Sequence, residues 1–210
     1  MVTDAPFRIA LLVLIMFNMG VTIHYRRKAA RSGDQVSRKE EGYLLAISLR
    51  LAGFLLWVTT LGYLFFPDFF RWASLPLPDF IRWCGLLLGL ICSSLLAWTL
   101  SCLGNNLTDT VVTRTNAKLV SHGPYGWVRH PFYVAAAGLM ISVTVLTKSA
   151  LIGLASLFVL SLLVVRTPKE EARLLERFGK SYQDYMAHTG RFVPWCNGLT
   201  AWIKFGRRSR

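Results

Sequence analysis

Five apolar stretches separated by short polar segments dominate this sequence. A helix needs roughly 20 apolar residues to cross the hydrocarbon core of a bilayer, and the first three stretches approach or exceed that length. The last two are shorter, and only Thr147 and Lys148 separate them, which predicts a helical hairpin. We therefore expect an all-α integral membrane protein with about five transmembrane helices, at about residues 7–23, 44–66, 80–103, 132–146 and 149–165.

Composition agrees with membrane spans and argues against an ordinary soluble domain. Hydrophobic residues make up 53% of the 210 residues and charged residues only 17%, against about 25% in soluble proteins. The mean hydropathy is +0.42. The first stretch is interpreted as a retained span and not a signal peptide, because the basic run Arg26–Lys28 follows it. In the third stretch, Gly85 and Gly89 lie about one turn apart, which permits close helix packing.

The basic residues indicate how the chain is oriented. The net charge is +13, from 24 Lys and Arg against 11 Asp and Glu, and most basic residues lie between or after apolar stretches. No nucleic-acid-binding motif accompanies them, so we predict contact with membrane lipids and no nucleic acid. Basic loops stay in the cytoplasm, which places residues 25–43, 104–131 and the C-terminal tail inside and the N-terminus outside. Short loops and the lack of a retention signal favour a bacterial inner membrane.

Neither the cysteines nor the histidines have the spacing of a metal site. There is no Cys-x-x-Cys pair, and no two histidines stand at helical ligand spacing. We predict buried or isolated side chains, no disulfide framework and no metal ion for Cys84, Cys92, Cys102, Cys196, His24, His122, His130 and His188.

The chain divides into three parts. Residues 1–103 form a three-span membrane region, residues 104–195 a core of loop, hairpin and C-terminal helices, and residues 196–210 a basic interfacial tail. Within the core, Ser181 is expected to cap a short helix that reaches about His188.

A separate helix is predicted to begin after the last apolar stretch. Thr167 suits the N-cap, Pro168 suits the first helical position, and Glu170 completes a capping box three residues after the cap. Gly179 is expected to end this helix.

A polar loop precedes the hairpin. Residues 121–133 read Ser-His-Gly-Pro-Tyr-Gly-Trp-Val-Arg-His-Pro-Phe-Tyr. Pro131 favours an extended backbone at His130 and suits the start of a helix. The N-terminus of that helix would present N–H groups and a partial positive charge to a carboxylate. The alternative is a loop that leads into the membrane and anchors it with interfacial aromatic residues.

An acidic pair and a polar cluster follow the last apolar stretch. Adjacent carboxylates such as Glu170 and Glu171 can bind the amino, hydroxyl or sulfonium groups of a cofactor, although the capping box is an alternative explanation for Glu170. The residues that follow at short spacing either complete a site or form the polar face of a helix: Tyr182, Tyr185, His188 and Arg191.

The loop motif, the hairpin, the Glu-Glu pair and the later Phe-Gly-x-x-Tyr-x-x-Tyr resemble the isoprenylcysteine carboxyl methyltransferase and phospholipid methyltransferase superfamily. The resemblance covers about residues 104–195. It implies an S-adenosylmethionine-dependent methyltransferase that encloses its cofactor between the loop, the hairpin and cytoplasmic C-terminal helices, and the chain has no Rossmann fingerprint. The resemblance implies these cofactor-binding residues: His122, Gly123, Tyr125, His130, Tyr133, Glu170 and Glu171.

The same resemblance bears on the methyl acceptor, a lipophilic or small molecule at the membrane. Arg129, Tyr185 and Arg191 are the implied substrate-binding residues, and Arg191 would orient a carboxylate acceptor. Many relatives have an arginine where this chain has His188, which leaves a carboxylate acceptor open. An amine or thiol acceptor would need a base, and Glu171, His188 or Tyr185 could serve.

Three rival functions remain open at this point. Within the same class, the chain could be a phospholipid N-methyltransferase. A membrane reductase would bind NADPH, and a non-catalytic membrane scaffold would bind neither cofactor. Cofactor binding therefore separates methyltransferase, reductase and scaffold.

Overall fold

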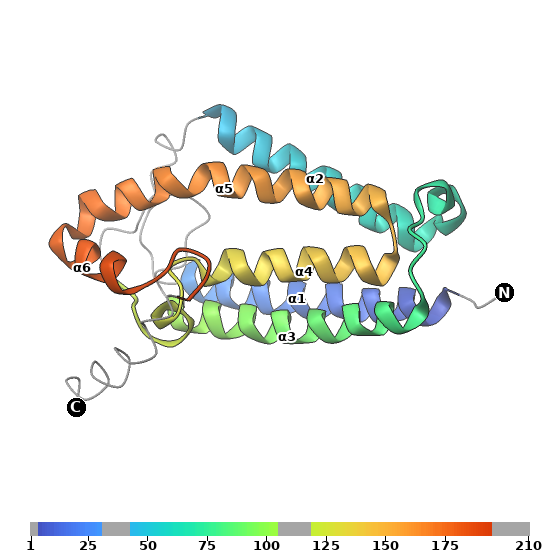
Figure 1. Ribbon diagram of the computed structural model, residues 1–210, viewed down its shortest axis with the longest axis horizontal. Coiled ribbons are helices and arrows are strands. Elements are labelled where there is room, and N and C mark those ends of the chain that lie inside the picture. The colour runs from blue at the N-terminus through green and yellow to red at the C-terminus, as the bar shows by residue number, and fades with distance from the viewer. Residues whose placement is uncertain (1–3, 31–42, 105–118, 195–210) are drawn as a thin grey trace.

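The computed structural model of the chain describes residues 4–30, 43–104 and 119–194. The tail predicted for residues 196–210, Cys196 and parts of the two basic loops lie outside the described residues. Helices account for all the regular structure in the described part, which confirms the all-α prediction (Figure 1). In chain order the elements are α1 (Ala5–Ala30), α2 (Tyr43–Phe65), the 3-10 helix η2 (Pro67–Ala73), α3 (Asp79–Leu103), the 3-10 helix η4 (Gly123–Gly126), α4 (Pro131–Thr147), α5 (Ala150–Phe178) and α6 (Lys180–His188).

Several of these helices have the length and composition of membrane spans. In the described part of the chain, four helices reach that length: α1, α2, α3 and α5. The remaining apolar helix, α4, has 17 residues and is shorter. The protein is therefore an integral membrane protein, and the count of five spans remains a prediction.

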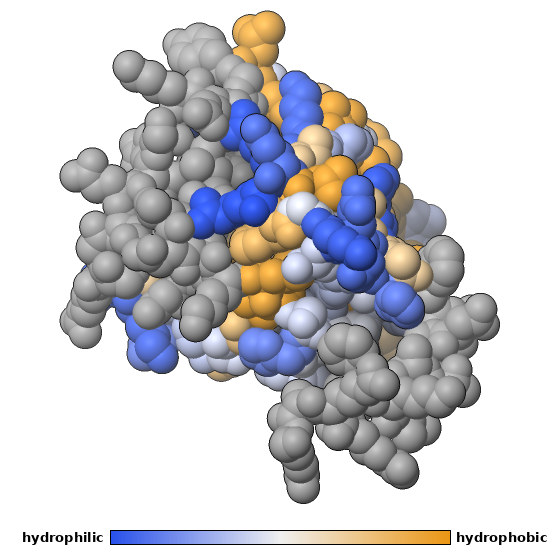
Figure 2. Space-filling model, turned by 90° about the vertical axis from the view of Figure 1, so that its left-hand side faces the viewer, coloured by the Kyte–Doolittle hydropathy of each residue, from blue (hydrophilic) through white to orange (hydrophobic). Residues whose placement is uncertain are grey.

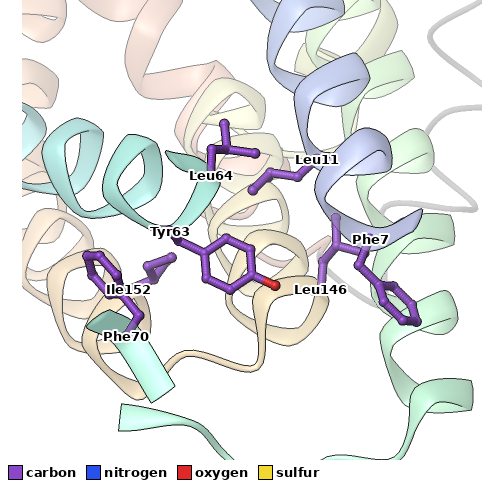
Figure 3. Close-up of a cluster of buried hydrophobic side chains, with 7 residues drawn as sticks. All are labelled: Phe7, Leu11, Tyr63, Leu64, Phe70, Leu146 and Ile152. Atoms are coloured by element: carbon purple, nitrogen blue, oxygen red, sulfur yellow. The ribbon is translucent and has the colours of Figure 1, made fainter. Parts of the chain in front are cut away.

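The long helices form two layers. In one layer α3 packs against α1 and α4, and in the other α2 packs against α5 (Figure 1). The layers join at the end of the molecule that carries η2 and the turn between α4 and α5. A buried cluster fills that end with side chains from both layers (Figure 3): Phe7, Leu11, Tyr63, Leu64, Phe70, Leu146 and Ile152.

Small residues let α3 and α4 approach closely, as predicted for Gly85 and Gly89. A Cβ added at Gly85 would lie 2.8 Å from Val145 Cγ1 and 3.2 Å from the backbone nitrogen of Leu146. Ser142 on α4 donates a hydrogen bond of 2.7 Å to the carbonyl of Gly85. Hydrogen bonds and close van der Waals contact, which drive helix association in lipid, therefore hold this pair of helices together.

An arginine that the sequence analysis did not single out is buried at the η2 end. Arg82 is 1% exposed. Its guanidinium donates to the Leu146 carbonyl at 3.0 Å, to Asp4 Oδ1 at 2.6 Å and to the Tyr63 hydroxyl at 3.2 Å, and it lies 3.5 Å above the Phe7 ring. Each guanidinium nitrogen thus meets an acceptor, and the cation links the start of α1, the end of α2 and the carbonyl end of α4.

The capping box predicted at Thr167 is wrong. Instead, α5 runs as one helix of 29 residues, and Thr167 and Pro168 lie inside it. Proline cannot donate to the carbonyl of Val164, but the buried Thr167 hydroxyl donates to the Leu163 carbonyl at 2.9 Å and supports the same turn. The apolar stretch therefore carries the helix past proline, and α5 rigidly holds Glu170 in its last turns.

The end of α5 lies where the sequence indicated, but the start of α6 does not. Gly179 ends α5 with a φ of 52°, and its N–H donates to the Leu175 carbonyl at 2.8 Å. The same glycine is the N-cap of α6, so the predicted cap at Ser181 is wrong. Because no linker intervenes, α6 folds back directly after α5.

Matched glycine substitutions test the close packing of α3. We expect Gly85→Ala to lower the free energy of unfolding by about 1–3 kcal/mol, because its Cβ would overpack against α4. Gly53→Ala on α2 has nothing within 4 Å and should be neutral or stabilising, since alanine favours helix. Thermal unfolding in detergent measures both. Equal shifts for the two variants would contradict close packing at Gly85.

Candidate functional site

The predicted site residues gather at the end of the molecule opposite η2. They come from the loop before α4, from the last turns of α5, from α6 and from the segment that follows α6. Two backbone hydrogen bonds place the last segment beside the loop: Arg129 N–H donates to the Gly190 carbonyl at 2.8 Å, and His130 N–H donates to the Arg191 carbonyl at 3.1 Å. Motifs about 60 positions apart in the sequence are thereby neighbours.

Glu171 is the centre of the charged part of the site. The residue is 5% exposed. Its Oε1 accepts from Arg129 Nε at 2.9 Å and from Arg191 Nε at 3.2 Å, its Oε2 accepts from Arg191 Nη2, and His130 Nε2 lies 3.2 Å from Oε1. A buried carboxylate is stable only when it is paired and hydrogen-bonded in this way. Its oxygens are engaged by cations, which suits a positioning role better than that of a base.

Arg129 is held by contacts with α5 and with the end of α6. Its side chain is 10% exposed. Besides Glu171, it donates through Nη1 to the carbonyls of Met186 and Thr189 at the end of α6. These are carbonyls that a helix C-terminus leaves without a partner. Arg129 therefore fixes α6 to the loop before α4.

Arg191 is the more accessible of the two arginines on Glu171. Its side chain is 43% exposed, although both Nε and Nη2 donate to the carboxylate. Hydrogen bonding to Glu171 raises the pKa of Arg191, so the guanidinium stays charged. Of the two cations, Arg191 is the one that a ligand can reach.

The second acid faces the start of α4. Tyr133 donates a hydrogen bond of 2.7 Å from its hydroxyl to Glu170 Oε2. The His130 ring stacks on Tyr133 with 5.4 Å between ring centroids and lies 5.7 Å from the ring of Phe192. Glu170 is thus oriented by Tyr133 on α4 and does not cap its own helix.

The η4 segment is fixed from two sides. The Tyr185 hydroxyl donates to the Tyr125 carbonyl at 2.6 Å, which ties α6 to η4. Gly123 has a φ of 62°, and a Cβ there would lie 2.7 Å from Cys102 Sγ and 3.3 Å from Trp98 Nε1. Only glycine fits this approach to α3 without strain. Burial raises the pKa of Tyr125 and of Tyr185, so both hydroxyls remain protonated.

Two predicted residues lie at the rim. His122 is exposed at the start of η4. His188 is exposed too, and its Nδ1 lies 2.8 Å from the Asp184 carbonyl of its own helix. In the described ranges, no group of three or more His, Cys, Asp or Glu side chains is arranged to hold a metal ion.

One member of the predicted polar cluster, to which the sequence analysis assigned no cofactor or substrate role, is buried in this region. Tyr182 on α6 is 1% exposed. Burial raises the pKa of its phenol, the charge of Glu171 raises it further, and the charge of Arg129 lowers it. Sequence spacing could not predict its burial, because the turn at Gly179 breaks the helical register between α5 and α6.

The surface at this end combines polar and apolar groups. Viewed from the α6 end, hydrophobic residues come to the surface between hydrophilic ones (Figure 2). A ligand with a charged group and a hydrocarbon part would meet both kinds of surface here.

Comparison with known proteins found one matching family and a similar solved structure. The model of the isoprenylcysteine carboxyl methyltransferase (ICMT) family matches residues 85–176, from α3 to the acidic pair on α5. The structure of the eukaryotic intramembrane Ras methyltransferase ICMT, solved without a monobody, resembles this fold with a TM-score of 0.51 and 21% sequence identity. The match covers 89% of this chain and 68% of that chain. No curated protein sequence matches the chain.

The pH dependence of stability tests the burial of His130. Burial lowers the pKa of His130 from its ordinary 6.5 and outweighs Glu170 and Glu171, which raise it. The unfolded chain therefore takes up a proton below about pH 6.5 that the folded chain does not, so stability falls with decreasing pH, by at most about 1.4 kcal/mol per pH unit from this group.

We expect His130→Gln to flatten this acid dependence in thermal unfolding experiments in detergent. His188→Gln, at an exposed histidine, is the control and should keep the wild-type slope because His130 is intact. The same slope in the wild type and in His130→Gln would contradict a buried, neutral His130.

Proposed function

We propose that the chain is a membrane methyltransferase of the isoprenylcysteine carboxyl methyltransferase type, and that it methylates a lipophilic acceptor with S-adenosylmethionine as the methyl donor. The match of the family model to residues 85–176 and the similarity of the fold support this proposal. We propose further that the acceptor carries a carboxylate. The observation that carries this second step is the pairing of Arg191 with the buried Glu171.

The donor chemistry of the site fits the cofactor. Glu170, oriented by Tyr133, can accept from the amino or ribose hydroxyl groups. No side chain caps the N-terminus of α4 at His130, which suits the methionyl carboxylate. His122, Gly123 and Tyr125 would border the cofactor from η4. When bound, the cofactor supplies an activated methyl group on sulfonium.

A carboxylate acceptor matches the state of the charged groups. Its oxygen would displace the methyl group from the sulfonium, giving a methyl ester and S-adenosylhomocysteine, and no proton would have to leave the acceptor. A cation that orients the acceptor is sufficient, and Arg191 is accessible for this role. Holding the two reactants in line can supply on the order of 7–11 kcal/mol of the barrier.

The other charged residues have supporting roles in this proposal. Glu171 holds Arg191 at the site in the ligand-free protein and is a poor base, because its oxygens accept from Arg129, His130 and Arg191. Arg129 positions α6 and does not need to touch the acceptor. An amine or thiol acceptor would need a base, which we assign to the exposed His188 only if the carboxylate proposal fails.

The surroundings suit an acceptor dissolved in the bilayer. A lipophilic acceptor would approach sideways between helices, while the soluble cofactor arrives from the α6 end. In our proposal this end faces the cytoplasm. Trp72 and Phe69, exposed on η2 at the other end, suit the opposite membrane interface.

Methyl transfer to a defined acceptor tests the proposal. We expect the purified protein to methylate an S-prenylated N-acetylcysteine with labelled S-adenosylmethionine and to bind S-adenosylhomocysteine but not NADPH. Methylation of phosphatidylethanolamine alone would replace the carboxylate acceptor by an amine. NADPH binding would favour the reductase, and binding of neither cofactor by folded protein would favour the scaffold.

A pair of arginine variants tests the role of Arg191. We expect Arg191→Ala to lower kcat/KM for the prenylated acid roughly 10- to 100-fold, because the acceptor loses a hydrogen-bonded cation. Arg71→Ala, at an exposed ion pair with Asp68 at the η2 end, should keep wild-type activity. Thermal unfolding would confirm that both variants fold. Wild-type kcat/KM in folded Arg191→Ala would remove this arginine from the mechanism.

A further inference from the structure

The hydroxyl of Tyr182 is buried without a hydrogen bond. The residue is 1% exposed, and among the described residues its hydroxyl has no partner. Leaving a buried hydroxyl unpaired is unfavourable. The nearby Tyr185, whose ring centroid lies 5.9 Å away, has its hydroxyl bonded to the Tyr125 carbonyl. The two tyrosines of α6 therefore differ in a way that simple packing does not explain.

The surroundings of the phenol are charged. The groups whose charges act on Tyr182 are two acids and two arginines, and Glu171 has the strongest influence among them. Burial raises the pKa of Tyr182, so the hydroxyl stays protonated and can donate. The four charged groups are Glu171, Arg129, Glu170 and Arg191. A hydroxyl donor without a partner thus lies within the electrostatic range of the Glu171 carboxylate.

The partners of Glu171 differ in how freely they can leave it. Arg129 also donates to two backbone carbonyls at the end of α6, and the His130 ring is buried between Tyr133 and Phe192. Arg191 has only the Glu171 contact among its side-chain hydrogen bonds that the structure describes, and its side chain is 43% exposed. When a carboxylate ligand attracts Arg191, Glu171 Oε2 loses the donor it now has.

We propose that Tyr182 is the reserve donor of this site: when Arg191 turns from Glu171 to a carboxylate ligand, the Tyr182 hydroxyl donates to Glu171 in its place. Tyr182 is then a positioning residue, since it acts through Glu171 and Arg191. The inference rests on the proposed function. The carboxylate belongs either to the acceptor or to the methionyl end of the cofactor, and both present the same group to Arg191.

This exchange predicts opposite effects in the empty and the ligand-bound protein. Tyr182→Phe removes an unpaired hydroxyl, so the ligand-free protein should be at least as stable as the wild type in thermal unfolding. Tyr185→Phe removes a bonded hydroxyl and should be less stable. Lower stability of ligand-free Tyr182→Phe, similar to that of Tyr185→Phe, would overturn the proposal, because the hydroxyl would then have a structural partner.

Ligand binding supplies the second readout and identifies the carboxylate. The first pair of ligands is S-adenosylhomocysteine and methylthioadenosine, which lacks the amino-acid end. The second pair is a prenylated N-acetylcysteine and its amide. In Tyr182→Phe we expect roughly tenfold weaker binding of the carboxylate member of one pair, which corresponds to the loss of one hydrogen bond to a charged group. The member of that pair without the carboxylate should bind as it does to the wild type. Tyr63→Phe, at the η2 end, should bind all four as the wild type does.

The outcomes are distinct. A loss confined to S-adenosylhomocysteine assigns the carboxylate to the cofactor, and a loss confined to the prenylated acid assigns it to the acceptor. Unchanged binding of both carboxylates, or equal losses for all four ligands, overturns the exchange. If the wild-type protein binds neither adenosine ligand, the proposed function itself fails, independently of Tyr182.

Discussion

The buried carboxylate of Glu171 joins three segments that are distant in the sequence. It receives hydrogen bonds from Arg129 before α4 and from Arg191 after α6, while α5 carries Glu171 itself. A carboxylate at 5% exposure needs such hydrogen-bonded cations to offset its lost hydration. The site depends on this arrangement, because it sets the loop, α6 and the following segment side by side. It also explains why the acid is a poor base and a good support for Arg191.

The rest of the fold positions Glu171 between Arg129 and Arg191. The two helix layers are fastened together at the opposite end, by the apolar cluster around Tyr63 and by the buried Arg82. From there α5 extends without a break past Pro168, so the acidic pair is held at the end of a rigid helix. Fastening at one end leaves polar and apolar groups together at the other, which suits a soluble methyl donor and a lipophilic acceptor.

The lengths of the apolar stretches and the family motifs predicted most of the fold but not the contacts within the site. The apolar stretches became helices near the expected residues, and the loop motif lies beside the acidic pair. The cap at Thr167 was predicted from local preference, which the continuing apolar helix overrode. Arg82 gave no signal, and the motif that contains Tyr182 did not show that its side chain is buried, because burial depends on partners far away in sequence. His122 and His188, implied by motif position, lie at the exposed rim.

Amide hydrogen exchange at Arg129 and His130 measures directly whether Glu171 holds the site together. These amides donate to the carbonyls of Gly190 and Arg191, the contacts that align the segment after α6 with the loop. In Glu171→Gln the charge that binds both arginines is lost. We predict faster exchange at these two amides than in the wild type, with unchanged exchange in the middle of α3. Equal exchange at Arg129 and His130 in both proteins would contradict the central role of Glu171.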